Sequence, residues 1–294
     1  MARMTGQVIR HPGPPVPNRY DAARCVVSPA TVRLTAGDDL LAILARACDG
    51  WDGAAVDLAG LHMGPFAYVM PDVARDGYHA AWYSPTHNGH AALIHTGTAM
   101  MGTRAGAPWF HAHALWHDLC PHTDQTPTDQ APTHMGHLRP GEVTVARDIT
   151  LSLWRWRGGT LDLDQDPETA FPIYHLRPTA PQHTVTVPNG VLVRLAPHED
   201  LRTRLSQIQA ELSLPPMRIM GVGSLIGATF DRTPAMASPI SETLISPGAL
   251  LGAQAHIPLW AVDPQGRLFH GDITKGGGAV LVTFELLLVP DNSR

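Results

Sequence analysis

Two stretches of the chain share the same order of apolar and polar positions, and each predicts a strand followed by a helix. An apolar run at 32–34 leads into a turn and the acidic pair Asp38 and Asp39, and the same order recurs at 193–200. Acidic side chains are favourable at a helix N-terminus because the unpaired backbone amides there carry partial positive charge. Apolar residues then follow at helical spacing in both stretches: Leu40, Leu41, Ile43 and Leu44 in the first, and Leu201, Leu205, Ile208 and Leu212 in the second.

Further similarities continue through both halves in the same order. The segment 93–97 resembles 244–248, 111–116 resembles 254–260, and 136–141 resembles 271–276. Each half then closes with an apolar run that contains one acid, Asp148 or Glu285. Similarity that repeats in order along a chain indicates duplication, and one helix on a mostly antiparallel sheet suits the predicted element order. We therefore predict an α+β fold class with two tandem copies of a small domain, each a mostly antiparallel sheet packed with one or two helices.

Segments rich in proline and glycine predict where the domains begin and end. Residues 1–26 contain several prolines and no periodicity, so we expect an N-terminal arm there. Residues 158–183 combine glycines, prolines and acidic side chains, which is typical of a linker or a surface-wrapping segment. The first domain is therefore predicted at 27–157 and the second at 184–290. The first carries an insertion, at about 71–92, that the second mostly lacks.

Composition narrows the possible partners and the compartment. The chain has 294 residues, 44% hydrophobic and 16% charged, which is typical of a globular protein. Its net charge of −5 offers no general attraction for nucleic-acid phosphates. The three cysteines are too scattered for a disulfide framework, so we expect reduced thiols and a cytoplasmic protein. No apolar stretch approaches the roughly 20 residues that span a bilayer, so no membrane partner is expected.

The motifs resemble those of the plants-and-prokaryotes-conserved (PPC) domain, of the bacterial type without an AT-hook. The first half carries His111-x-His113, then Gly136-His137, then a closing strand with an acid, and the second half carries a Gly-Ser turn at 223–224. The resemblance covers about 27–157 and 184–290. It implies an α+β fold, a trimer, a metal at the histidines in some members and a DNA-binding label in many. The Arg-Gly-Arg-Pro AT-hook of the plant proteins is absent here, and Met135 replaces one family glycine.

Three histidines in the first half have the spacing of metal ligands. His111 and His113 alternate with alanines, so in a strand both imidazoles project from one face. His137 lies in a turn bounded by glycine, where the backbone can approach closely. Three neutral imidazoles suit Zn²⁺, and also Ni²⁺ or Fe²⁺, and leave one position open for water or substrate. The alternative is that they are ordinary polar residues on a half-exposed strand.

Other residues are candidates for supporting roles. Asp148 matches the acid of the family's closing strand and is the candidate general base, the alternative being an ion pair at the strand end. Candidates for substrate binding are Arg33, His134 and Arg194, and ion pairing with a neighbouring acid is the alternative for both arginines. In the second half a degenerate site replaces the histidine trio: Gln254, His256 and Asp272. Glutamine is a poor zinc ligand, so no metal is expected there.

The sequence therefore predicts a metal-binding protein that acts on or binds a small anionic molecule at a three-histidine site in the first domain. The expected cofactor is a divalent transition metal, with zinc first. Two alternatives remain open: a DNA-binding regulator, as the family label implies, and a non-catalytic sensor of a ligand or a metal. Whether the protein is an enzyme is not decided by any residue.

Overall fold

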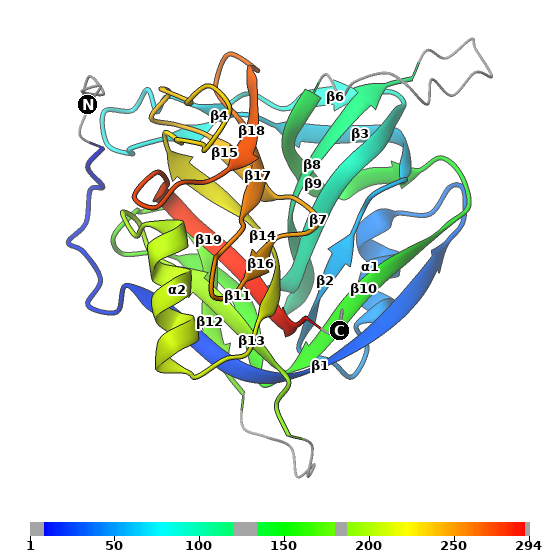
Figure 1. The fold of residues 1–294 in the computed structure, drawn as a ribbon. Coiled ribbons are helices and arrows are strands. Elements are labelled where there is room, and N and C mark those ends of the chain that lie inside the picture. Colours follow the sequence, from blue (N-terminus) through cyan, green and yellow to red (C-terminus); the bar gives the residue numbers. More distant parts are fainter. Residues whose placement is uncertain (1–8, 120–133, 180–186, 292–294) are drawn as a thin grey trace.

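The fold is mostly antiparallel β-sheet, and the predicted α+β class is wrong. The computed structural model describes residues 9–119, 134–179 and 187–291. Within these residues there are only two helices, of 8 and 11 residues, and strands make up most of the rest (Figure 1). Helical spacing of apolar residues is limited to these two short segments, and the alternating pattern elsewhere forms long strands. Neither described helix is long and apolar enough to cross a membrane.

The first half contains one helix and ten strands among its described residues. Its elements are β1 Tyr20–Leu34, α1 Leu40–Ala47, β2 Gly53–Asp57, β3 His62–Val69, β4 Pro71–Asp72, β5 Trp82–Tyr83, β6 His87–Gly89, β7 Ala92–Arg104, β8 Ala107–Asp118, β9 His134–Val145 and β10 Ile149–Arg157. The strands β3, β7, β8 and β9 pair in a ring, β3 with β7, β7 with β8, β8 with β9, and β9 with β3. The two strands that carry the histidine motifs, β8 and β9, are therefore held on both edges.

The second half also contains one described helix. Its elements are β13 Gly190–Leu195, α2 Leu201–Glu211, β14 Met217–Ile226, β15 Glu242–Ile245, β16 Leu250–Leu251, β17 Pro258–Val262, β18 Leu268–Asp272 and β19 Ala279–Pro290. The closing strand β19 lies between β13 and β14, antiparallel to both. In the first half β10 lies between β1 and β2 in the same way. The predicted similarity of sequence therefore coincides with a similarity of strand order.

Both helices begin where the sequence places the acidic residues. The Asp39 side chain accepts a hydrogen bond from the Ala42 amide at 2.8 Å, and that of Asp200 accepts one from the Thr203 amide at 2.9 Å. Such caps satisfy amides that have no partner inside the helix. Each helix then buries its leucines and isoleucines against the sheet of its own half. The two helices lie on opposite sides of the molecule in Figure 1.

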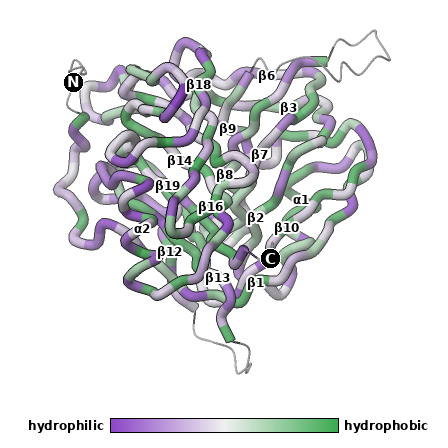
Figure 2. Tube along the Cα trace, viewed as in Figure 1, coloured by the Kyte–Doolittle hydropathy of each residue, from purple (hydrophilic) through white to green (hydrophobic). Residues whose placement is uncertain are grey.

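Strand β1 and a shared apolar cluster join the two halves. Residues Tyr20–Cys25 of β1 pair with β13, and Val26–Leu34 pair with β10. A cluster of buried residues contains Leu115 and Met135 from the first half with Leu244 and Leu287 from the second. Of the predicted arm at 1–26, residues 1–8 lie outside the described residues, and the end of the arm forms the first part of β1. Figure 2 shows hydrophobic segments along these central strands.

A hairpin follows the first half, made of β11 Gly159–Gln165 and β12 Pro172–Pro178. It occupies most of the segment 158–183 for which we expect a linker, and residues 180–183 lie outside the described part. Strand β11 also pairs in parallel with β7, Asp162 opposite Thr103. The turn between the two strands is anchored by the buried Asp166, which accepts hydrogen bonds from the amides of Glu168 and Thr169. This hairpin brings Phe171 and Tyr174 beside the histidine strands.

Candidate metal centre

The three predicted histidines lie together on β8 and β9. His111 and His113 are two residues apart on β8, so both side chains project from one face of the sheet. Strand β9 pairs with β8 so that His137 lies opposite His113. The ring centroids are 4.7 Å apart for His111 and His113, 4.9 Å for His111 and His137, and 5.3 Å for His113 and His137.

A carboxylate from the second half completes the group. Glu242, at the start of β15, places Oε2 at 2.8 Å from Nε2 of His113. One possible ligand atom from each of the three histidines and from Glu242 lies within 4.8 Å of every other. No motif in the sequence points to Glu242, which stands before a short apolar run. Only the packing of β15 beside β8 brings it to the histidines.

Two of the imidazoles are held through their other ring nitrogen. His111 Nδ1 lies 2.8 Å from Oε2 of Glu285, and the Thr283 hydroxyl donates to the other oxygen of Glu285 at 2.7 Å. His113 Nδ1 donates to the backbone carbonyl of Thr243 at 2.8 Å. These bonds turn both Nε2 atoms toward each other, 3.1 Å apart. Histidines that bind metals usually donate their second nitrogen to a carboxylate or a carbonyl in this way, which fixes the tautomer and the ring orientation.

The surroundings shift the pKa values of two of these histidines in opposite directions. Burial lowers the pKa of His111, but the Glu285 carboxylate and its hydrogen bond outweigh burial, and the pKa lies above its usual value. The pKa of His137 lies well below its usual value because of burial and of its neighbours His111 and His113. His137 is therefore neutral at neutral pH, as a metal ligand must be.

Three imidazole nitrogens and one carboxylate oxygen form a donor set that fits a divalent transition metal. Imidazole suits Zn²⁺, Ni²⁺ and Fe²⁺, and a carboxylate is a common fourth ligand of zinc. His113 is fully buried and the His111 side chain is 14% exposed. The group is thus reached from one side, where a cavity meets it.

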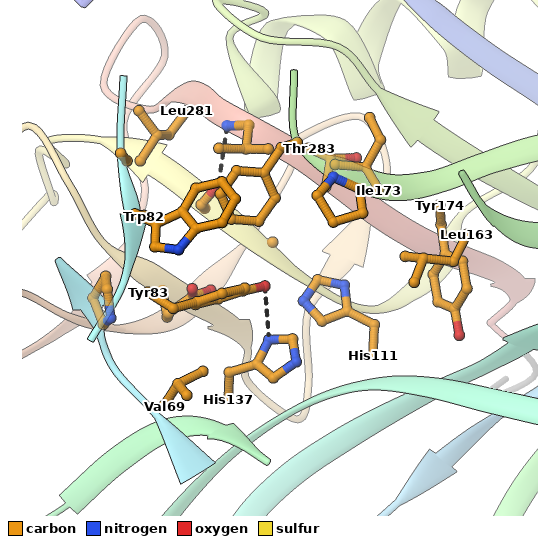
Figure 3. A pocket seen from close by; sticks show the side chains of 18 of the residues that line it. Val69, Trp82, Tyr83, His111, His137, Leu163, Ile173, Tyr174, Leu281 and Thr283 are labelled. Carbon is orange, nitrogen blue, oxygen red and sulfur yellow. Dashed lines mark hydrogen bonds between the residues drawn. The ribbon is translucent and has the colours of Figure 1, made fainter. Parts of the chain in front are cut away.

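This cavity has a volume of about 280 Å³ and opens onto His111, His137 and Glu242. Tyr83 of β5 lies beside them, with its hydroxyl 3.5 Å from His137 Nδ1 (Figure 3). Loss of hydration raises the pKa of the Tyr83 phenol well above its usual value, and the carboxylates of Glu242 and Glu285 add to the effect. The phenol therefore keeps its proton at neutral pH and can donate a hydrogen bond inside the cavity.

The structure places Asp148 and Arg33 together, outside this cavity. Asp148 forms an exposed ion pair with Arg33 at 3.3 Å and accepts a hydrogen bond from the Ala36 amide at 3.0 Å. The Ala36 bond and the Arg33 guanidinium both lower the pKa of the Asp148 carboxyl. Glu285, the acid inside the closing strand β19 of the second half, is the one that contacts a histidine of the trio.

The candidates for substrate binding lie apart from the histidine trio. His134 begins β9, and its Nε2 lies 3.3 Å from Oδ2 of Asp118 at the end of β8. Its ring stacks on Trp116. Arg194 is buried, with its guanidinium 3.4 Å from both Asp21 and Asp166. Neither lines the cavity.

The degenerate second site does not form a cluster of metal ligands among the described residues. His256 is exposed and pairs with Asp272 at 2.9 Å, and Gln254 is exposed nearby in sequence. A second Asp272 oxygen accepts a hydrogen bond from the Ile257 amide, so this acid fixes the start of β17.

Comparisons with known proteins give distant similarity only. No protein-family model and no curated protein matches the chain. Several solved structures are similar over about half of it. A metal-containing protein from Archaeoglobus fulgidus is 14% identical over 50% of this chain and 93% of its own, with a TM-score of 0.36. A protein from Ralstonia eutropha JMP134, named for proposed DNA binding, is 18% identical over 50% and 90%, with a TM-score of 0.35. A plant- and prokaryote-conserved (PPC) protein from Pyrococcus horikoshii is 13% identical over 54% and 96%, with a TM-score of 0.34.

Proposed function

We propose that this protein binds a divalent transition metal, with zinc first, and that it binds or acts on a small molecule in the cavity beside the metal. The ligands in this proposal are His111, His113 and His137 from the first half and Glu242 from the second. The supporting observation is the convergence of four ligand atoms within 4.8 Å of one another. When bound, such a metal acts as a Lewis acid toward an oxygen of the bound molecule or lowers the pKa of a bound water.

The protein groups around the metal have separate roles in this proposal. Glu285 and the Thr243 carbonyl hold the imidazoles of His111 and His113 in position. Tyr83 can donate a hydrogen bond inside the cavity, where its hydroxyl faces His137. We also propose that the second half is a diverged copy of the first and serves mainly to complete the site of the first. The trimer that the PPC resemblance implies stays a prediction, which analytical ultracentrifugation can test.

The experiment is elemental analysis of protein purified at neutral pH without chelator. We expect about one transition-metal ion per chain in the natural protein and none in His113→Ala. His256→Ala is the matched control, because the His256 side chain is exposed and pairs with Asp272, away from the trio, and it should keep the metal. Natural protein that neither contains metal nor takes up added zinc would overturn the proposal.

DNA binding is not proposed. The net charge of −5 gives no general attraction for a phosphate backbone, and no observed contact favours it over a small molecule. A salt-dependent shift of random duplex DNA at micromolar protein would contradict this choice.

A further inference from the structure

The cavity beside the metal centre is walled by two segments that fall outside the repeated pattern of the chain. Trp82 and Tyr83 come from the 71–92 insertion, which the second half mostly lacks, and Phe171 and Tyr174 come from the β11–β12 hairpin. Tyr174 also packs in the apolar cluster that joins the halves, whereas Trp82 and Tyr83 are not part of it. The position of both segments over the histidines points to a binding function for this wall.

Aromatic side chains of the cavity wall, Trp82 and Tyr83 among them, lie beside the histidines (Figure 3). The ring centroids of Trp82 and Phe171 are 4.5 Å apart, those of Phe171 and Tyr83 are 5.2 Å apart, and those of Tyr83 and His137 are 5.2 Å apart. Trp82 is 40% exposed, whereas most large apolar side chains of this protein are buried. An exposed indole at the mouth of a cavity is a surface that a flat apolar ligand can cover.

The two arginines that line the cavity, Arg104 and Arg139, differ in their partners. Arg139 is neutralised by Glu142, with Nε 2.6 Å from the carboxylate. Arg104 also lines the cavity, stacked 5.0 Å from the ring centroid of Trp109, and forms no ion pair with any described carboxylate. It is exposed, like Trp82, so both mark the mouth. An unpaired guanidinium in a planar, stacked setting suits a carboxylate, which it can bind through two hydrogen bonds.

The volume limits the size of a ligand. A cavity of about 150 Å³ holds one benzene molecule, so about 280 Å³ accommodates a single ring with one or two small substituents. A larger polycyclic molecule would not fit without movement of the wall.

We propose that the cavity binds a small aromatic carboxylate. The carboxylate pairs with Arg104 at the mouth, the ring packs against Trp82, Phe171 and Tyr83, and the far edge of the ring faces the histidine group. This inference deepens the proposed function, on which it rests for what happens at the far edge, but the contacts that hold the ligand are independent of the metal.

The test is calorimetric titration with three probes: benzoate, benzyl alcohol, which lacks the charge, and acetate, which lacks the ring. We expect benzoate to bind at least tenfold more tightly than either of the others. Arg104→Gln should weaken benzoate about tenfold and leave benzyl alcohol unchanged, which also shows that the variant is folded. Trp82→Ala should weaken both ring-containing probes.

Matched controls are Arg218→Gln, an exposed arginine on β14, and Tyr78→Ala, an exposed aromatic residue of the same insertion. Neither residue lines the cavity, and neither substitution should change benzoate binding. Equal affinity for benzoate and benzyl alcohol, no saturable benzoate binding at millimolar concentration, or an Arg104→Gln variant with natural affinity would each overturn the proposal.

The metal is tested separately. Benzoate should bind the metal-free His113→Ala variant with an affinity within about threefold of the natural protein. Loss of binding in that variant would show that the metal, not Arg104, receives the carboxylate. Because elemental analysis reports on the metal independently, a metal-containing protein that ignores benzoate overturns this proposal alone.

Discussion

Glu285, in the second half of the chain, holds the imidazole of His111, in the first half. It is fully buried, accepts a hydrogen bond from Thr283 and lies 2.8 Å from His111 Nδ1. Removal of such a partner of a metal ligand typically weakens metal binding 10- to 100-fold. We therefore expect Glu285→Gln to weaken zinc binding by at least about tenfold, measured by competition with a chromophoric chelator. Asp148→Asn, which changes the exposed acid just before the closing strand of the first half, should change nothing, and equal losses in both variants would contradict this assignment.

The two cysteines among the described residues, Cys25 and Cys48, should react slowly with alkylating reagents, because burial keeps their thiols protonated. Burial raises the pKa of Cys25 to about 12 and that of Cys48 to about 11. The thiolate is the reactive form, and at pH 8 both groups keep their protons. In a Cys120→Ser background, iodoacetamide at pH 8 should label native protein far more slowly than urea-unfolded protein, as read by mass spectrometry. Equal labelling rates would show that these thiols are accessible.

At the scale of residues, the sequence predicted a position well where the pattern lay within a single strand. Alternation placed His111 and His113 on one face, and the repeat identified one acid in or just before each closing strand. Spacing cannot show that the acid beside the histidines is Glu285 and not Asp148, because that choice depends on how the halves pack. Glu242 and Tyr83 had no local signal at all, since their roles arise only from the strands beside them.

At the scale of elements, the hairpin β11–β12 depends on a buried ion pair. Arg194 of β13 reaches Asp166 in the hairpin turn and Asp21 of β1, and both Arg194 and Asp166 are buried. Removing one partner of a buried pair costs about 3–5 kcal/mol because the other charge stays unpaired. Arg194→Met should therefore lower the free energy of unfolding in urea by about 3 kcal/mol.

Arg33→Met is the matched control, since Arg33 occupies the corresponding place in the first half. Its partner Asp148 is exposed, and exposed pairs contribute at most about 1 kcal/mol. If the two variants lose equal stability, the buried pair does not anchor the hairpin.

The sequence predicted best the elements whose ends and buried faces are set by residues close together in the chain. Both helices start at their acidic caps, and their leucines face the core, as the spacing requires. The segments 71–92 and 158–183 have polar, proline-rich sequences that carry no strand signal. Their strands form partly because partners outside the segments exist: β11 pairs with β7 and β6 pairs with β3. Short strands of this kind depend on tertiary context, which also explains why an α+β class was predicted for a mostly β fold.

At the scale of the molecule, the candidate ligands span both halves, so metal binding should stabilise both together. Strand β1 pairs with β10 and β13, and a shared apolar cluster joins the halves. We expect one cooperative thermal transition, followed through Trp156 in the first half and Trp260 in the second by single-tryptophan variants. Zinc at 100 times its Kd should add about 2.7 kcal/mol and raise the Tm seen by both probes by about 5 °C. His113→Ala should show no shift. Two transitions, of which zinc moves only the one seen by Trp156, would mean that the halves are independent and that Glu242 does not bind the metal.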